Sequence, residues 1–248
     1  AGCPLGLWDL PDPVGCLALR GSEEAVVALR HGFGLLNLAS GEVEALDKPV
    51  TASKRIRFND GCTDRFGHFF AGTMDVEASD PIACLYRLDA DLTWHEVENN
   101  LIIANGTCVS PDGLIFYLAD SARKVIWAYD MDPSSGSLTK RRVLVDVGSL
   151  GLVPDGCTVD AAGFLWSSCV GSGKIVRYDP KGRMVSGVTI PTRFVSSVAF
   201  GGSDLEILFV TSIMERHFNL PDQDPLAGGL FAVSGLGTKG LVEARFGD

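Results

Sequence analysis

The sequence lacks long hydrophobic runs and has little positive charge. No apolar run reaches the roughly 18 residues of a membrane-spanning helix, and the start, AGCPLGLWDL, has no basic stretch followed by an apolar one. Lysine and arginine number 21 against 31 acidic residues, for a formal net charge of −10. Such a surface repels phosphate backbones and anionic lipids. We therefore expect no nucleic-acid partner and no membrane partner, and the unpaired cysteines described next favour a cytoplasmic protein.

Several motifs of metal binding and catalysis are also missing. The seven cysteines are odd in number and include no C-x-x-C pair. This pattern favours reduced, mostly buried thiols over a disulfide framework or a zinc site. The sequence has no G-x-S-x-G nucleophile motif. VGSGK at 170–174 lacks the spacing of a phosphate-binding loop and a following helix, so it is typical of a hairpin turn.

Helical periodicity is almost absent, and short alternating apolar runs between glycine turns predict strands along the whole chain. One phrase recurs with variations: NDGCTDRFGHFFAGT (59–73), NGTCVSPDGLIFYLAD (105–120) and DGCTVDAAGFLWSSC (155–169). The copies begin at glycines 46, 45 and 50 residues apart: Gly15, Gly61, Gly106 and Gly156. A fifth, degenerate copy begins near Ser197. Four short strands per period predict an all-β propeller, which we expect to form a single domain over residues 1–248.

The residue before the repeat glycine is Asp60, Asn105 and Asp155 in three of the copies. Equivalent positions of a propeller surround one axis, so these side-chain oxygens should converge at one end of the channel. Oxygen ligands suit a hard cation such as Ca²⁺, Mg²⁺ or Mn²⁺. Zn²⁺ more often recruits histidine or cysteine, and the four histidines stand outside the repeat phase. The alternative interpretation is coincident turn chemistry, since Asp and Asn before Gly also form hairpin turns.

Arg57 and Asn59 precede this position in the first of the three copies. The forked donor of arginine and the amide of asparagine can together hold a hydroxylated or anionic substrate. Arg57 on an exposed strand is an equally good interpretation of the sequence alone.

Five phrases together resemble one protein family. They are RFNDG…FAGTM (57–74), ANG.CVSPDG..FY..D (104–120), VPDG..VD..G.LW (153–166), VSSVAFGG.DL..LFVTS (195–212) and PLAGGLFAV (225–233). In this order they resemble the senescence-marker-protein/gluconolactonase/luciferin-regenerating-enzyme family, which includes regucalcin, and the second phrase looks closest to bacterial sugar lactonases.

The resemblance implies a six-bladed β-propeller that holds one divalent cation (Ca, Zn, Mg or Mn) and hydrolyses an aldonolactone to the aldonic acid. By motif, Asn105 and Asp155 match metal ligands, and Asp155 also matches the general base. Arg57 and Asn59 match substrate-binding positions. Glu77 falls where some members direct a carboxylate toward the substrate, and Asp60 is a candidate for positioning substrate or water.

The sequence departs from the family in one respect. Members begin with a GEGP.W phrase whose glutamate is a third metal ligand, and no such phrase is present here. We count five repeats, and LWDLPDPV (7–14) resembles the tail of a truncated first blade. The expectation is therefore a six-bladed fold with its first blade truncated or missing. Without the third ligand the metal affinity should be weaker. The missing strands would leave a sheet edge exposed to association, so we expect a monomer or a weak homo-oligomer.

Two functional classes fit the sequence. The first is a metal-dependent lactonase, with a related esterase or organophosphate hydrolase as a variant of the same chemistry. The second is a non-catalytic propeller that binds a metal or a small ligand, because a fold does not determine a function.

Overall fold

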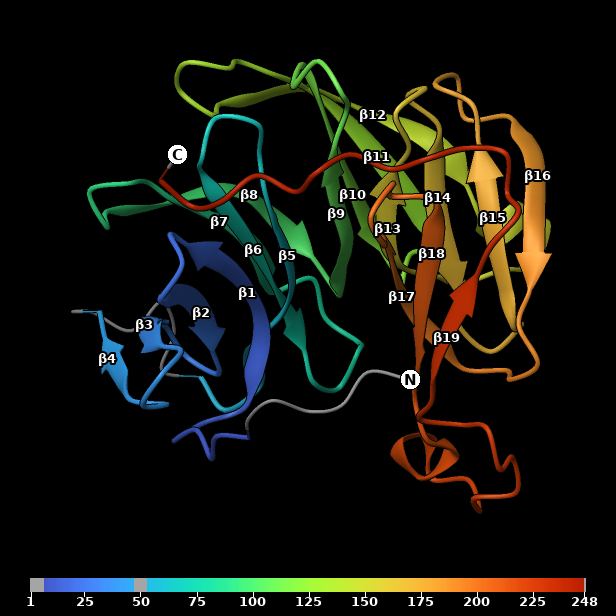
Figure 1. The fold of residues 1–248 in the computed structure, drawn as a ribbon, viewed down its shortest axis with the longest axis horizontal. Helices are drawn as coiled ribbons and strands as arrows, with labels where there is room; N and C mark the ends of the chain where they lie inside the picture. Colours follow the sequence, from blue (N-terminus) through green and yellow to red (C-terminus); the bar gives the residue numbers. More distant parts are fainter. Residues whose placement is uncertain (1–6, 47–52, 248) are drawn as a thin grey trace.

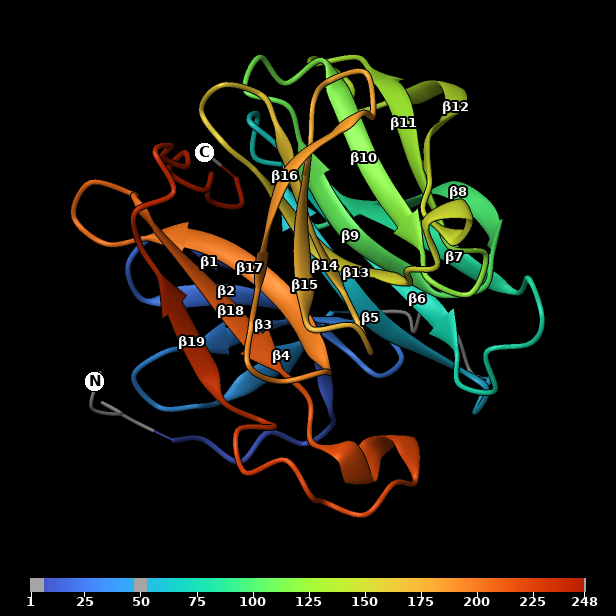
Figure 2. The same cartoon turned by 90° about the vertical axis from the view of Figure 1, so that its right-hand side faces the viewer.

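The protein is described by a computed structural model that covers residues 7–46 and 53–247. Nineteen strands and two short 3-10 helices are present in this part of the chain. The strands form five antiparallel sheets, the blades, which surround a common axis (Figures 1 and 2). The described residues include no helix of the length and apolar character needed to cross a bilayer.

Four of the blades contain four strands each, and these follow one another outward from the axis. Blade 1 contains β1 (Val14–Arg20), β2 (Glu24–Leu29), β3 (Phe33–Asn37) and β4 (Val43–Ala45). Blade 2 contains β5 (Ile56–Thr63), β6 (Phe69–Asp75), β7 (Ala83–Leu88) and β8 (Trp94–Leu101). Blade 3 contains β9 (Ala104–Val109), β10 (Ile115–Asp120), β11 (Val125–Met131) and β12 (Leu138–Asp146). Blade 4 contains β13 (Pro154–Val159), β14 (Leu165–Cys169), β15 (Lys174–Tyr178) and β16 (Met184–Thr189).

Blade 5 has three strands, β17 (Val195–Gly201), β18 (Ile207–Ser212) and β19 (Leu230–Val233). The 3-10 helix η1 (Gly148–Leu150) links blades 3 and 4, and η2 (Glu215–Phe218) lies in the long connection between β18 and β19.

The expectation of six blades is wrong, because the ring has five. Each of the five sequence repeats supplies one inner strand and one blade, whereas the number six came from the family resemblance. The expected remnant of a truncated blade at 7–14 is also not found: residues 7–13 form no strand, and β1 begins a complete four-stranded sheet.

Every inner strand contains a β-bulge at the same place. The pairing with the second strand shifts register near the repeat glycine in β1, β5, β9 and β13, and at the corresponding Ser197 in β17. A bulge bends the strand and redirects its side chains, which here aims the residues beside the glycine into the channel. The repeat thus encodes a kink in each inner strand as well as a turn.

The repeat glycines let neighbouring inner strands approach closely. A Cβ atom on Gly106 would lie 2.6 Å from the carbonyl oxygen of Asp155, and one on Gly156 would lie 2.3 Å from Ser197 Oγ. Neither position has room for a side chain. Gly106 also has a φ of +51°, a left-handed conformation that glycine adopts at least cost.

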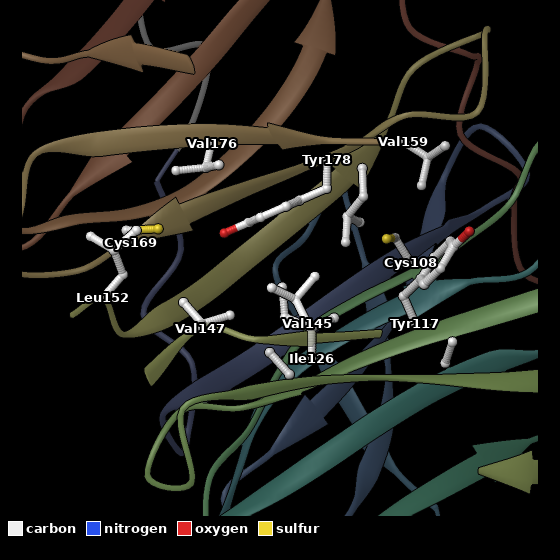
Figure 3. Close-up of a cluster of buried hydrophobic side chains, with 13 residues drawn as sticks. Cys108, Tyr117, Ile126, Val145, Val147, Leu152, Val159, Cys169, Val176 and Tyr178 are labelled. Carbon is white, nitrogen blue, oxygen red and sulfur yellow. The ribbon is translucent and has the colours of Figure 1, made fainter. Parts of the chain in front are cut away.

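The core lies between the sheets. Between blades 3 and 4, Ile126 and Val145 face Val176 and Tyr178, all of them buried (Figure 3). Strands that are covered on both faces read as nearly continuous apolar runs, and β10, for example, is buried at five of its six positions. Burying each such side chain stabilises the fold by roughly 1.5–3 kcal/mol.

The C-terminal segment, residues 236–247, crosses one face of the ring from blade 5 toward blades 1 and 2 (Figure 1). On the way, Thr238 Oγ1 donates to Asp160 Oδ2 of blade 4 at 3.1 Å. At its end the Phe246 amide donates to the Leu19 carbonyl at 2.8 Å, and the Phe246 ring is buried in the core between blades 1 and 2. The segment therefore ties the last blade to the first two.

Candidate functional site

The bulges bring the predicted polar residues to one end of the channel. A cavity of about 620 Å³, called the polar cavity here, is lined by Arg57, Asn59, Asp60, Asn105 and Asp155. These side chains come from the inner strands of blades 2, 3 and 4. Its volume lies in the range of small-molecule sites.

A chain of hydrogen bonds connects the three blades at this cavity. Asn59 Nδ2 donates to the Ala104 carbonyl and to Asn105 Oδ1, both at 2.9 Å. Asn105 Nδ2 donates to Ser121 Oγ at 2.9 Å, and Ser121 Oγ donates to the Pro154 carbonyl at 2.7 Å. The Asn105 amide is therefore held in one orientation, and its oxygen keeps a second lone pair for another ligand.

Arg57 extends this chain of hydrogen bonds by one more side chain. One of its amino groups donates to the Phe58 carbonyl at 2.8 Å and to Asn59 Oδ1 at 3.1 Å. Partial burial, together with the positive charge of Arg30, lowers the pKa of the guanidinium. A partly desolvated cation with unused donors is suited to receive an oxygen-rich ligand.

The two carboxylates of the polar cavity lie in an environment that disfavours their charge. Desolvation, with a smaller contribution from the Asp60 carboxylate, raises the pKa of Asp155 to about 8. Desolvation also raises the pKa of Asp60, although the Gly61 amide donates to its Oδ1 at 2.9 Å and the Thr107 amide to its Oδ2 at 3.4 Å. Within the described ranges, no lysine or arginine donates a hydrogen bond to either carboxylate.

The carboxylate and amide oxygens of this cavity fit a hard divalent cation. Two clustered carboxylates without a cationic partner, next to an amide oxygen with a free lone pair, match the oxygen ligands that Ca²⁺ and Mg²⁺ prefer. Asn105 and Asp155 could hold such an ion, with Asp60 close by. The described part of the chain has no group of three or more histidine, cysteine, aspartate or glutamate side chains placed to bind a metal. Water would have to complete the coordination.

The structure does not bring Glu77 into this cavity. Its side chain is 62% exposed and lies 3.3 Å from an Arg55 amino group, and the residue is not among those that line the polar cavity. A role toward the substrate stays a prediction. None of the four histidines lines the cavity either.

Sequence reasoning missed Ser121 and Lys124, which both line the polar cavity. Ser121 follows the last residue of β10 and is buried, and it joins Asn105 to blade 4. The signal available in the sequence was the polar phrase ADSARK (119–124) after an apolar strand. The phrase reads as an ordinary hairpin turn because its partners come from other repeats.

Comparison with known proteins shows which family the chain resembles. A family model described as SMP-30/Gluconolactonase/LRE-like region matches residues 4–214. The chain belongs to this family. Its resemblance to the SMP-30/gluconolactonase/LRE proteins, inferred above from five phrases, is thereby confirmed.

Three relatives within the SMP-30/gluconolactonase/LRE family illustrate the likeness. The chain is 34% identical to 6-deoxy-6-sulfogluconolactonase from Pseudomonas putida, over 96% of this chain and 82% of that protein. It is 35% identical to regucalcin from Oryctolagus cuniculus, over 92% and 79% of the two chains. The crystal structure of a calcium-binding protein, regucalcin, from Agrobacterium tumefaciens superposes with a TM-score of 0.86 at 26% identity, over 96% of this chain and 80% of that one.

Proposed function

We propose that this protein hydrolyses a sugar lactone to the open-chain acid with the help of one divalent cation. The observation that carries the proposal is the convergence of Arg57, Asn59, Asn105 and Asp155 on one cavity of about 620 Å³. The SMP-30/gluconolactonase/LRE membership supports the reaction class, since a relative is named for a gluconolactone substrate. The calcium-binding regucalcin supports a divalent cation.

In this mechanism the cation, when bound, polarises the lactone carbonyl and lowers the pKa of a water molecule. Asn105 and Asp155 would hold it. Arg57 and Asn59 orient the ring oxygen and hydroxyl groups of the substrate, because their donors face the same cavity. The Asp155 carboxylate accepts a proton from the attacking water, because it lines the cavity in which Arg57 and Asn59 would orient the substrate. The protonated Asp155 can then return the proton to the departing alkoxide.

A second candidate is a non-catalytic propeller that binds a cation or a small ligand. It is favoured by the small number of protein ligands: the described residues provide two carboxylates and two amides at this site, and the oxygen of one amide, Asn59, already accepts a hydrogen bond from Arg57. A binding protein needs no general base, so Asp155 separates the two candidates.

The deciding experiment measures lactone hydrolysis by pH-stat with a panel of aldonolactones. The protein is stripped with a chelator and then supplied with Ca²⁺, Mg²⁺, Mn²⁺ or Zn²⁺ one at a time. We expect activity to disappear on stripping and to return with at least one ion. Failure of every ion to restore hydrolysis, with cation binding still visible by calorimetry, would favour the binding protein.

The variant Asp155→Asn tests the assigned base. It removes both the base and a charged cation ligand, so the turnover number should fall by about 100-fold or more even at saturating cation. Glu44→Gln, on the exposed strand β4, is the matched control and should retain wild-type turnover. Wild-type turnover in Asp155→Asn would contradict the assignment.

A further inference from the structure

The opposite end of the channel is lined by thiols. A cavity of about 450 Å³, called the thiol cavity here, lies on the far side of the bulges and is lined by Cys62, Cys108 and Cys157 and by residues 242–245 of the C-terminal segment. Asp60 lines both this cavity and the polar cavity, so it lies where the two meet. The thiol cavity has no part in the proposed hydrolysis.

Four cysteines stand close behind a repeat glycine, one in each of the first four blades. Cys16, Cys62 and Cys157 directly follow a repeat glycine, and Cys108 stands two residues after one. In β9 and β13 the register resumes at these residues, because Cys108 pairs with Tyr117 and Cys157 pairs with Ser167. Two of the thiols therefore extend from neighbouring inner strands immediately beyond their bulges.

Cys108 and Cys157 are already in contact. Their sulfur atoms lie 3.0 Å apart, against about 2.05 Å in a disulfide. The Cys157 thiol also donates to the Gly106 carbonyl at 2.7 Å. Gly106 permits this approach, because any side chain there would collide with β13. Closing the remaining gap requires a movement of about 1 Å.

We propose that Cys108 and Cys157 form a reversible disulfide that cross-links blades 3 and 4. A peroxide small enough to enter the thiol cavity is the oxidant. The sulfur of Cys157 attacks one peroxide oxygen, the O–O bond breaks, and the products are a sulfenic acid and water. The sulfur of Cys108 then displaces hydroxide from the sulfenic acid and gives up its proton, which completes a second water. Two thiols are thus oxidised by two electrons, and one hydrogen peroxide is reduced.

The cross-link would join the strands that carry Asn105 and Asp155. Asn105 lies three residues before Cys108, and Asp155 lies two residues before Cys157. The disulfide would replace the hydrogen bond from Cys157 to Gly106 and would fix the separation of the two bulges. It closes a long loop in the unfolded chain, so the oxidised protein should have a higher denaturation midpoint than the reduced protein.

The test treats the whole protein with hydrogen peroxide and counts thiols after denaturation. We expect the loss of two of the seven thiols, recovery of both with dithiothreitol, and a tryptic product that joins the peptides of Cys108 and Cys157. The denaturation midpoint should rise on oxidation and return on reduction. Unchanged thiols under conditions that fully oxidise free cysteine would overturn the proposal, as would a link that involves Cys62 or Cys16 instead.

Cysteine variants test the pairing independently of the tryptic products. Cys108→Ser and Cys157→Ser should each lose both the joined product and the rise in the midpoint. Cys84→Ser, which removes a thiol from β7 outside the thiol cavity, is the matched control and should retain both. Should either serine variant fold poorly, fragmentation of the joined wild-type product by tandem mass spectrometry still decides the question, because the tryptic peptide 143–174 carries Cys169 as well as Cys157. A Cys84→Ser protein without the joined product would overturn the proposal.

Discussion

Two junctions of the ring are built in different ways. Between blades 3 and 4 the inner strands β9 and β13 pack directly together, with Gly106 against the Asp155 carbonyl and a buried apolar cluster behind them. Between blades 5 and 1 the C-terminal segment makes the connection, and Leu17 and Leu19 of β1 are 51% and 45% exposed. The candidate site lies at the first kind of junction. Positioning two cation ligands requires strands that cannot shift, whereas a peripheral tie can tolerate looser packing.

The largest expected effect comes from breaking the tight junction with Gly106→Ala. A Cβ atom 2.6 Å from a backbone oxygen, at a φ of +51°, combines steric overlap with left-handed strain. We expect the free energy of unfolding to fall by about 5 kcal/mol. Chemical denaturation measures the loss. Gly151→Ala is the control, since Gly151 has a φ of +70° but open space around it, and it should cost only about 1 kcal/mol. Equal losses in the two variants would show that the close packing at Gly106 contributes nothing.

Phe246→Ala breaks the other junction. The ring is 1% exposed among the aromatic and apolar side chains of blades 1 and 2, so its removal leaves a cavity. The free energy of unfolding should fall by about 3–5 kcal/mol. Because the polar cavity lies at the other end of the channel, cation affinity should stay unchanged under native conditions. Val242→Ala, at a site 77% exposed in the same segment, should change stability by less than about 0.5 kcal/mol. A large loss of cation affinity in Phe246→Ala would show that the two junctions are coupled.

Ser121→Ala sharpens the comparison at the site itself. The variant leaves Asn105 Nδ2 and the Pro154 carbonyl without their partner, which frees the Asn105 amide to rotate. Loss of such an orienting contact typically costs 10–100-fold in metal affinity, and we expect about 10-fold here. Isothermal titration calorimetry with Ca²⁺ gives the value. Ser172→Ala, at a turn of blade 4 and not among the residues that line the cavity, should bind as the wild type does.

The smallest expected effect concerns the turn beside the C-terminal segment. His68 Nδ1 lies 2.7 Å from Asp64 Oδ2, and this hydrogen bond raises the pKa of His68. The charged pair therefore stabilises the fold fully below the unfolded pKa of about 6.5, and the contribution is lost as the pH rises through the raised folded pKa. His68→Gln should be less stable than the wild type by about 1 kcal/mol or less at pH 5.5, with the difference shrinking toward alkaline pH. A difference independent of pH would assign the effect to packing.

The sequence was sufficient where the repeat itself carries the information. Five copies of one phrase predict five inner strands, and a shared phase predicts that Asp60, Asn105 and Asp155 converge. The number of blades was wrong because it was taken from the resemblance rather than from the repeats. The phase of the thiols was equally visible in the sequence, but each cysteine read alone is typical of a buried residue.

Contacts between different repeats could not be predicted from the sequence. Ser121 acts through the backbone of Pro154, and no spacing along the chain encodes that meeting. The C-terminal segment has no periodic apolar pattern, and its anchor is a single phenylalanine. Both depend on how far each blade is rotated about the axis, which only the packed structure specifies.

The position of Phe246 also constrains the order in which the protein can be completed during synthesis. A chain emerging from the ribosome exposes blades 1 and 2 early, yet the core between them includes a ring that is made almost two hundred residues after Phe58. Until that ring arrives, Phe33, Phe58 and Phe69 lack one of their buried neighbours. The core between the first two blades therefore stays incompletely packed until residue 246 has been synthesised. During this interval its exposed apolar surface is most accessible to chaperones and most prone to aggregation.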